Sequence, residues 1–279
     1  MKRRLLSLVL FFLGLGLCSY PLVSNILSRL EQQRIIKTYE QEIKGSDDGA
    51  LKESLADAEK YNKALYRISD TAIGNELNDI LSYESYNSLL NIRGDGIMGS
   101  IEIPDIDVDL PIYHGTEEEN LAVGVGHVYG SSLPIGGSDT HSLLTSHSGM
   151  PNAKLFTRLD ELELGDYFYI TICNEKTTYK VCDIQVIKPE EVDRLNIEEG
   201  GNLISLITCT PYGINTHRLV VTGEQTDYTE SVISNVDSLY HTMSLRELIF
   251  TILPFAFIAI AITSGIKNRK GRIQNEKKK

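Results

Sequence analysis

The chain has 279 residues and a formal net charge of −11. Residues 2–4 and 267–279 hold 10 of its 27 lysines and arginines but only one acid, Glu276, so the residues between them carry 17 basic and 37 acidic side chains. A surface with that excess of negative charge repels nucleic acid, which excludes a nucleic-acid-binding function. It is compatible with cationic, lysine-bearing partners, although solubility alone explains it more simply.

Two long apolar runs flank this acidic stretch. Residues 5–23 and 248–266 contain no charged residue, and each is long enough to cross a hydrocarbon core that needs about 20 apolar residues. Basic residues collect at the outer end of each run, which predicts a cell-membrane protein with both termini cytoplasmic and the middle extracytoplasmic. We expect residues 1–24 to be retained as an anchor, because no small-x-small cleavage site is visible; a cleaved secretion signal would place the domain identically.

Between the first apolar run and residue 95 the pattern is helical. Residues 27–43 and 49–68 repeat apolar side chains at spacings of three and four, and the glycine-containing segment 44–49 separates them. A third, shorter helix fits residues 74–90. Residues 25–95 are therefore predicted to form an N-terminal helical region.

From residue 96 onward short apolar runs are separated by turn residues. Residues 101–110 place isoleucine, valine and leucine between polar partners, and further β-type runs follow. Because no long helix intervenes, these runs predict a closed antiparallel or mixed β-barrel over residues 96–226. After it we expect a connector, residues 227–246, a second membrane span, residues 247–266, and a basic tail, residues 267–279.

Three cysteines lie outside the first apolar run: Cys173, Cys182 and Cys209. A hairpin turning near residues 174–176 would hold Cys173 and Cys182 about 13 Å apart, farther than the ~7 Å between Cα atoms that a disulfide tolerates. We expect both to be small buried residues, which leaves Cys209 as an unpaired thiol in an oxidising compartment. No Cys-x-x-Cys or His-Glu-x-x-His pattern occurs, so no metal site is predicted.

Cys209 has the sequence surroundings of a nucleophile. It ends an apolar run between two threonines, Pro211 then turns the chain out of the sheet, and Arg218 begins the next strand. If residues 210–216 form the loop, pairing of 209 with 218 places thiol and guanidinium on one face. The positive charge there favours a thiolate and a developing oxyanion. The alternative is a small hydrophobic residue that closes a strand, the commoner role of a lone cysteine.

A cysteine nucleophile also needs an imidazole with which to exchange a proton. Among the six histidines, His127 and His147 both stand where an apolar stretch meets a glycine. Strand alternation turns His217 away from the face of Arg218, and His241 lies near the second membrane run. Spacing alone does not separate His127 from His147.

Several segments resemble the sortases, and specifically class C, the pilin-polymerising transpeptidases of Gram-positive surfaces. The segments are "LITCTPYGINTHRL", "GVGHVYGSSLPIGG" and "SHSGMPNAKLFTRLDELELGD", and the resemblance covers about residues 75–225. It implies a mainly β fold: a closed, eight-stranded sortase-type barrel with an N-terminal helical segment and two flanking transmembrane helices. By position the family's catalytic histidine falls on His147, where the usual Gly-His-Arg-Gly is replaced by residues 146–149, Ser-His-Ser-Gly.

The resemblance also implies a mechanism. Cys209 would attack the threonine carbonyl of a Leu-Pro-x-Thr-Gly-like sorting signal on a pilin and form a thioester, while His147 would move the protons and Arg218 would hold the signal or the oxyanion. A lysine amine of another pilin subunit would accept the acyl group. Thr208 and His127 are expected to contact the substrate. No metal or organic cofactor is expected, and the partners are pilin subunits and the lipid bilayer.

One expected feature of the class is missing, and alternatives remain open. Class C relatives carry an Asp-Pro-aromatic lid ahead of the barrel, but no proline occurs here between Pro21 and Pro104; the nearest candidate is residues 70–72, so we expect a more open groove. An anchoring sortase that uses cell-wall peptide shares the same chemistry. A non-enzymatic, membrane-tethered assembly module is a further alternative. A papain-like protease fits less well, because its cysteine precedes its histidine at a helix start.

Overall fold

The computed structural model describes residues 2–70, 79–150, 153–227 and 256. The chain divides into two compact units, one made of Met1–Leu27 with Thr242–Lys279 and the other of Ser28–His241. In the first unit, helix α1 (Lys2–Gly45) begins with an apolar window of mean hydropathy 2.1, none of it buried, which is long and apolar enough to cross a membrane. Nearly all of the expected connector, the second membrane span and the basic tail lie outside the described residues.

In the second unit, the rest of α1 packs on the barrel. Its buried side chains include Ile36, Tyr39 and Ile43, at the helical spacing that the sequence predicts. The Tyr39 hydroxyl donates to the carbonyl of Met98 at 2.9 Å and accepts the backbone N–H of Cys173 at 3.3 Å. The Tyr39 hydroxyl therefore links this helix to two segments that are far apart in the chain.

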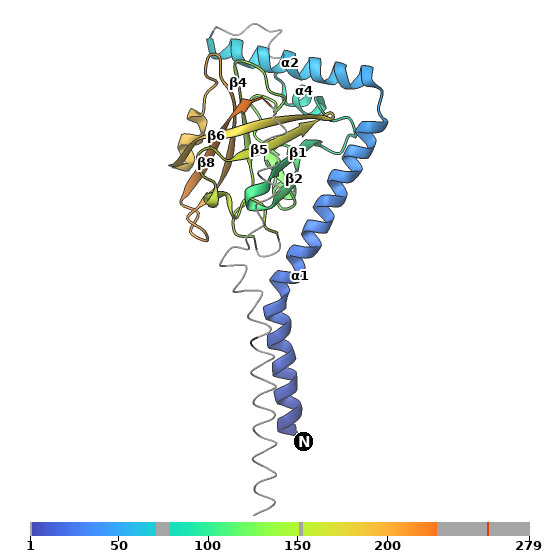
Figure 1. Ribbon diagram of the computed structural model, residues 1–279, viewed down its shortest axis with the longest axis vertical. Helices are drawn as coiled ribbons and strands as arrows, with labels where there is room; N and C mark the ends of the chain where they lie inside the picture. The colour runs from blue at the N-terminus through green and yellow to red at the C-terminus, as the bar shows by residue number, and fades with distance from the viewer. Residues whose placement is uncertain (1, 71–78, 151–152, 228–255, 257–279) are drawn as a thin grey trace, which may run out of the picture. The chain divides into compact units, whose positions relative to one another are not determined.

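Further helices follow in the N-terminal region. Helix α2 (Asp48–Asp70) follows the predicted break and crosses above the strands in Figure 1. The Asn62 side chain fixes it to the barrel through hydrogen bonds with both the carbonyl and the N–H of Leu133. Within the predicted third helix, residues 74–90, the described residues 79–80 are helical and helix α4 spans Tyr83–Ser88. Residues 71–78, which include most of the candidate lid position, lie outside the described residues.

The predicted eight-stranded closed barrel is confirmed. The order around it is β1-β2-β3-β4-β7-β8-β6-β5, with β2–β3 and β4–β7 parallel and the other pairs antiparallel. Short helical segments α5 (Glu118–Leu121), η1 (Pro104–Ile106), η2 (Leu159–Glu161) and η3 (Pro189–Arg194) lie between strands. The strands are β1 (Ile97–Ile103), β2 (Val108–His114), β3 (Val125–His127), β4 (Thr140–Thr145), β5 (Tyr167–Ile172), β6 (Glu175–Ile187), β7 (Asn202–Thr210) and β8 (His217–Thr226).

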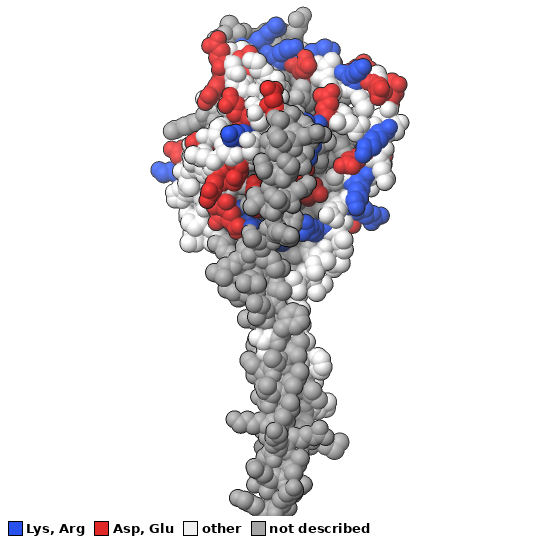
Figure 2. All heavy atoms as spheres, viewed as in Figure 1, with Lys and Arg blue, Asp and Glu red and all other residues white. Residues whose placement is uncertain are grey.

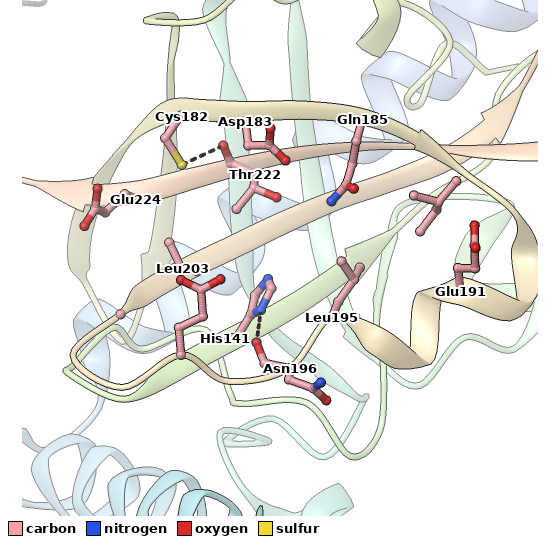
Figure 3. Close-up of a pocket in the computed structure, with 13 residues that line it drawn as sticks. His141, Cys182, Asp183, Gln185, Glu191, Leu195, Asn196, Leu203, Thr222 and Glu224 are labelled. Carbon is pink, nitrogen blue, oxygen red and sulfur yellow. Dashed lines mark hydrogen bonds between the residues drawn. The ribbon is translucent and has the colours of Figure 1, made fainter.

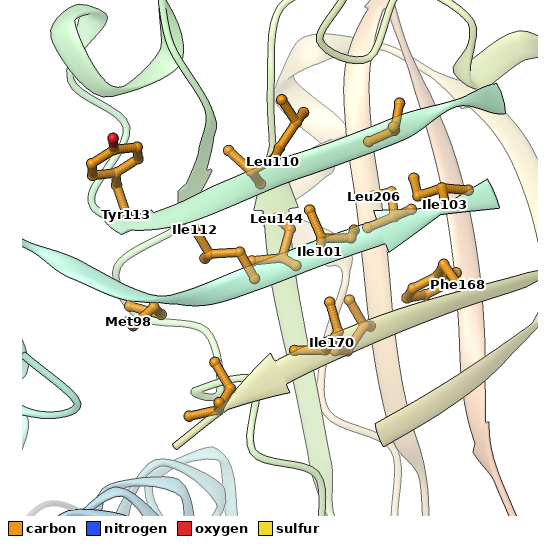
Figure 4. Close-up of a cluster of buried hydrophobic side chains, with 14 of the residues drawn as sticks. Met98, Ile101, Ile103, Leu110, Ile112, Tyr113, Leu144, Phe168, Ile170 and Leu206 are labelled. Carbon is orange, nitrogen blue, oxygen red and sulfur yellow. The ribbon is translucent and has the colours of Figure 1, made fainter. Parts of the chain in front are cut away.

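The barrel interior is filled by alternate strand residues (Figure 4). Ile101 and Leu206, for example, are completely buried, and their polar neighbours along each strand point elsewhere. Gly223 has no side chain because the Phe168 ring, stacked on Tyr179, lies 2.4 Å from where its Cβ would stand. On the face seen in Figure 2, acidic and basic side chains are interspersed, as on a surface whose charge serves solubility.

The cysteine expectations are half right. The hairpin between β5 and β6 turns at Cys173 and Asn174, both with positive φ, slightly earlier than predicted. Cys173 is buried as expected, but Cys182 is exposed. In β6, Tyr179 and Val181 are buried while Lys180 and Cys182 are exposed, so strand alternation accounts for the outward position of Cys182. All three described cysteines, these two and Cys209, are free thiols.

The Tyr39 bridge generates a stability prediction. Tyr39→Phe leaves the Met98 carbonyl and the Cys173 N–H buried without that partner, which should lower the free energy of unfolding by about 1–3 kcal/mol. Urea unfolding of the detergent-solubilised chain measures the change. Tyr83→Phe is the matched control, because the Tyr83 hydroxyl bonds the exposed Glu117 carboxylate at the surface.

A second prediction concerns Asp109, which lies directly across from Glu102 in the β1–β2 ladder. Burial, reinforced by the nearby Glu102 and Glu40 carboxylates, raises the pKa of Asp109 to about 6. The folded state therefore holds this proton more tightly than the unfolded chain, so stability falls as the pH rises from about 4 to about 6. Asp109→Asn should raise the free energy of unfolding by roughly 1–2 kcal/mol above pH ~6 and have little effect below pH ~4.

Unfolding curves at several pH values test this expectation. Asp160→Asn, at an exposed aspartate, controls for the simple loss of one negative charge. A gain for Asp109→Asn that is the same at pH 4 and pH 7.5 contradicts the assignment.

Candidate active site

Strand β7 is the central strand of the candidate site. On one side it pairs antiparallel with β8, and Cys209 stands directly opposite Arg218, so the predicted register is confirmed. On the other side it pairs parallel with β4, whose last pair joins Thr145 to Ile207. Two residues beyond that pair, His147 comes level with Cys209. Three neighbouring strands thus bring the thiol, the imidazole and the guanidinium residues to the same end of one sheet.

Hydrogen bonds carry the β4–β7 pairing past the end of β4. The Ser146 N–H donates to the carbonyl of Ile207 at 3.1 Å, and the Ser146 carbonyl accepts a hydrogen bond from the Thr208 hydroxyl at 2.8 Å. The Ser148 hydroxyl donates to the carbonyl of Cys209 at 2.6 Å. The backbone on both sides of His147 is therefore attached to β7. Both serines that replace the family's glycine and arginine make side-chain contacts, since the Ser146 hydroxyl also donates to the carbonyl of Gly124 at 2.7 Å.

Cys209 itself is a partly exposed free thiol at the end of β7. Its side chain shares the outward face of the sheet with Ile207, because alternate residues of a strand point to the same side. Ile207 forms a small apolar cluster with Leu143 and Val220, separate from the main core. The cluster is flanked by Val192 and Leu195 of the segment between β6 and β7. The three side chains are buried, so the cluster packs β4, β7 and β8 together beside the thiol.

Arg218 places its guanidinium against the loop between β7 and β8. It donates to the carbonyls of His217 at 3.1 Å and Asn215 at 3.4 Å. Among the described residues it forms no ion pair with a carboxylate. Its positive charge is therefore not neutralised in this part of the chain, as stabilisation of an anionic intermediate requires.

The same loop contacts the turn that follows His147. Gly149 has φ +79°, and a Cβ at this position would stand 2.8 Å from the ring of Tyr212. A side chain at residue 149 is thus excluded both by the backbone conformation and by the tyrosine. The residue retains the last glycine of the family pattern for a steric reason.

The His147 side chain is partly exposed and faces a carboxylate that the sequence analysis did not identify. Its Nε2 lies 3.2 and 3.3 Å from the two carboxylate oxygens of Glu118, on α5. Glu118 is 29 residues away in the chain, inside an unremarkable run of three glutamates, so no spacing rule connects it with His147. Only the packing of α5 beside β3 and β4 brings the two together.

His127 does not lie on this face. It pairs with Leu144, a main-core residue, and is completely buried. Its Nδ1 is hydrogen-bonded to the Tyr86 hydroxyl at 2.9 Å, and its Nε2 to the carbonyl of Ser132 at 2.8 Å. Burial lowers the pKa of His127 to about 4, so the ring is neutral at physiological pH. Its position supports a structural role and gives no support to the expected contact with substrate.

Thr208 is buried, on the opposite face of β7 from Cys209, and its hydroxyl donates to the Ser146 carbonyl. It therefore fixes the backbone beside His147, and its contact with substrate stays a prediction.

The other histidines lie elsewhere. His217 pairs with Thr210 and bonds Thr216, on the opposite face from Arg218 as predicted, and His241 lies outside the described residues. His141, at the far end of β4, contacts the carbonyl of Asn196 and the hydroxyl of Ser205, both at 2.8 Å. It lines a pocket of about 600 Å³ with Cys182 and Thr222 (Figure 3). That pocket lies toward the other end of β7 from Cys209. Within the described ranges, no cluster of three or more potential ligands for a metal ion occurs.

Comparisons with known proteins agree with this geometry. The family model described as sortase domain matches residues 101–226. Sortase A of Streptococcus agalactiae is 28% identical over 158 residues, a match that spans 53% of this chain and 63%, less than two thirds, of that protein. Sortase A of Listeria monocytogenes is 27% identical over 184 residues, spanning 63% of this chain and 81% of that protein.

Solved structures add the class. Sortase C1 of Streptococcus agalactiae is 40% identical, with a TM-score of 0.64 over 70% of this chain and 100% of that one. Clostridium perfringens sortase C, solved with the C-terminal cell wall sorting motif, is 41% identical, with a TM-score of 0.60 over 70% of this chain and 99% of that one. With its closed barrel, and with the thiol and guanidinium residues on β7 and β8 level with the imidazole residue just past β4, the chain belongs to the sortase family, and it resembles the class C sortases in structure.

Proposed function

We propose that this chain is a membrane-anchored transpeptidase that cleaves an LPxTG-like sorting signal on a pilin subunit and transfers the acyl group to a lysine amine of another. The observation that carries the proposal is the level placement of Cys209, His147 and Arg218 around β7. The 37% identity to sortase C1 of GBS Pilus Island 1 supports the pilin substrate. The apolar start of α1 supports a membrane anchor, and the basic flanks of both apolar runs support cytoplasmic termini.

In the first half-reaction the Cys209 thiolate attacks the carbonyl carbon of the signal's threonine. The tetrahedral intermediate carries a negative oxygen, which the Arg218 guanidinium stabilises. Collapse of the intermediate breaks the threonine–glycine C–N bond, and His147 gives a proton to the leaving amine. The products are a Cys209 thioester and the released C-terminal fragment.

In the second half-reaction the acceptor lysine amine attacks the thioester. His147 takes a proton from the attacking nitrogen, the C–S bond breaks, and the thiolate is regenerated with formation of an isopeptide bond. Water competes with the amine for the thioester, so the site must exclude water while the thioester persists.

A second candidate function is an anchoring sortase that joins surface proteins to cell-wall peptide. The matches to sortase A proteins at 27–28% identity favour it, and it uses the same three side chains. Offering both acceptors, a pilin domain and a cell-wall peptide amine, to the same acyl-enzyme separates the two. Formation of a pilin-to-pilin isopeptide bond supports pilus assembly, and transfer only to the cell-wall peptide supports anchoring.

The chemistry is tested with the full chain in detergent, a quenched sorting-signal peptide and hydroxylamine as acceptor. Hydroxamate should form, and Cys209→Ala should abolish it, because no other described thiol lies beside His147 and Arg218. His147→Ala and Arg218→Ala should each lower kcat by roughly 10²–10⁴-fold, the range for loss of a proton-transfer or oxyanion-stabilising group.

Cys182→Ala is the matched control, since it removes an exposed thiol at the bulge in β6. Activity that survives in Cys209→Ala overturns the proposed nucleophile. Cleavage without hydroxamate indicates a hydrolase, and the absence of any turnover in the parent chain leaves the non-enzymatic assembly module as the better description.

Ser148 provides a finer prediction. Ser148→Ala removes the 2.6 Å hydrogen bond that joins the turn after His147 to the Cys209 carbonyl, so the imidazole is less well placed. We expect kcat to fall about tenfold, equivalent to one hydrogen bond of ~1.4 kcal/mol, with little change in KM. Ser46→Ala, which removes the hydrogen bond from a serine hydroxyl just past the end of α1 to the Glu42 carbonyl, controls for the substitution. A change confined to KM means that Ser148 acts on substrate binding instead.

A further inference from the structure

We propose that Glu118 is a positioning residue for the reaction, which orients the His147 ring and fixes the proton on its Nε2. The inference rests on the proposed function for the role of His147. The contact between His147 and Glu118 is independent of that function: Nε2 lies 3.2 and 3.3 Å from the two carboxylate oxygens.

The segment that carries Glu118 is firmly held. The Asn120 side chain donates to the carbonyl of His114 at 2.9 Å, and the Asn120 backbone carbonyl accepts a hydrogen bond from the N–H of Gly124 at 2.9 Å. From α1, the buried Gln32 side chain donates to the carbonyl of Val123 at 3.0 Å. The backbone of α5 is thus fixed to β2, to the start of β3 and to the N-terminal helix.

Close packing against β3 adds to this. A Cβ on Gly126 would stand 2.9 Å from a methyl carbon of Leu121 and 2.4 Å from the Gly115 carbonyl oxygen, so α5 lies directly on the strand. Although the Glu118 side chain is 76% exposed, it starts from a backbone that has little freedom, and His147 is held on both sides by β7. The pair is the meeting of two fixed segments, which distinguishes it from an ordinary surface contact between long mobile side chains.

The chemical consequence follows from the two nitrogens of imidazole. A neutral ring carries its hydrogen on one nitrogen only, and a carboxylate at Nε2 accepts a hydrogen bond only from the tautomer protonated there. Nδ1 is then the nitrogen with the lone pair, and it is the one left to exchange a proton with the thiol, the leaving amine and the acceptor amine. Without Glu118, the ring can rotate and both tautomers compete, so a smaller fraction of molecules is ready to react.

The neighbouring glutamates do not share this arrangement. Glu117 accepts the Tyr83 hydroxyl at 3.0 Å, and Glu119 is exposed. Glu119→Ala is therefore a matched control, because it removes the same charge from the same short helix without touching His147.

The test uses the full chain in detergent, with Glu118→Ala, Glu118→Gln and Glu119→Ala compared in the hydroxylamine transfer assay. Glu118→Ala should lower kcat about fivefold with KM unchanged, since only the readiness of the imidazole is affected. Glu118→Gln keeps an acceptor oxygen and should restore part of the rate. Glu119→Ala should match the parent chain.

The second readout is independent of turnover. In ¹⁵N-histidine-labelled protein, the ring-nitrogen signals of His147, identified by their loss in His147→Ala, should show a hydrogen on Nε2 in the parent and a mixture of tautomers in Glu118→Ala. Unchanged ring signals together with unchanged kcat overturn the inference. If the parent chain transfers nothing to hydroxylamine, the proposed function fails, and the ring-nitrogen signals alone still decide the role of Glu118.

Discussion

The site depends on the double pairing of β7. This strand is hydrogen-bonded to β4 on one side and to β8 on the other. Cys209, near its end, therefore lies between the imidazole residue that follows β4 and the guanidinium residue of β8. Neither distant helix nor flexible loop has to close for the three groups to come level. The hydrogen bonds of Ser146, Ser148 and Thr208 continue the pairing with β7 past the end of β4, so the backbone on both sides of His147 is fixed to β7.

Features that depend on residues close together in the chain could be predicted from the sequence. The barrel follows from short alternating runs without long helices, and the pairing of Cys209 with Arg218 follows from a short loop that joins two consecutive strands. The choice between His127 and His147 could not be made in this way, because it depends on which face each short strand turns to the interior. His127 lies on the inner face, satisfied by Tyr86.

Two other features were not predicted, for different reasons. The exposure of Cys182 follows from the alternation of β6, in which Tyr179 and Val181 are buried, but the prediction considered only its distance from Cys173. The pairing of Glu118 with His147 joins residues from separate connections between strands, and its existence depends on how α5 packs on β3. Non-local contacts of this kind are decided by tertiary packing, whereas hairpin registers are decided by loop length.

The contact between Tyr212 and Gly149 has a consequence for engineering this enzyme. Loop grafting treats the β7–β8 connection as an independent module that can be exchanged for another specificity. Here the Tyr212 ring of that connection occupies the space above Gly149, and the preceding residue, Ser148, is hydrogen-bonded to the Cys209 carbonyl. The turn that follows His147 therefore fits closely against the β7–β8 connection. A transplanted loop without a flat side chain at this point leaves a gap over the turn, and successful chimeras will need both connections from the same parent.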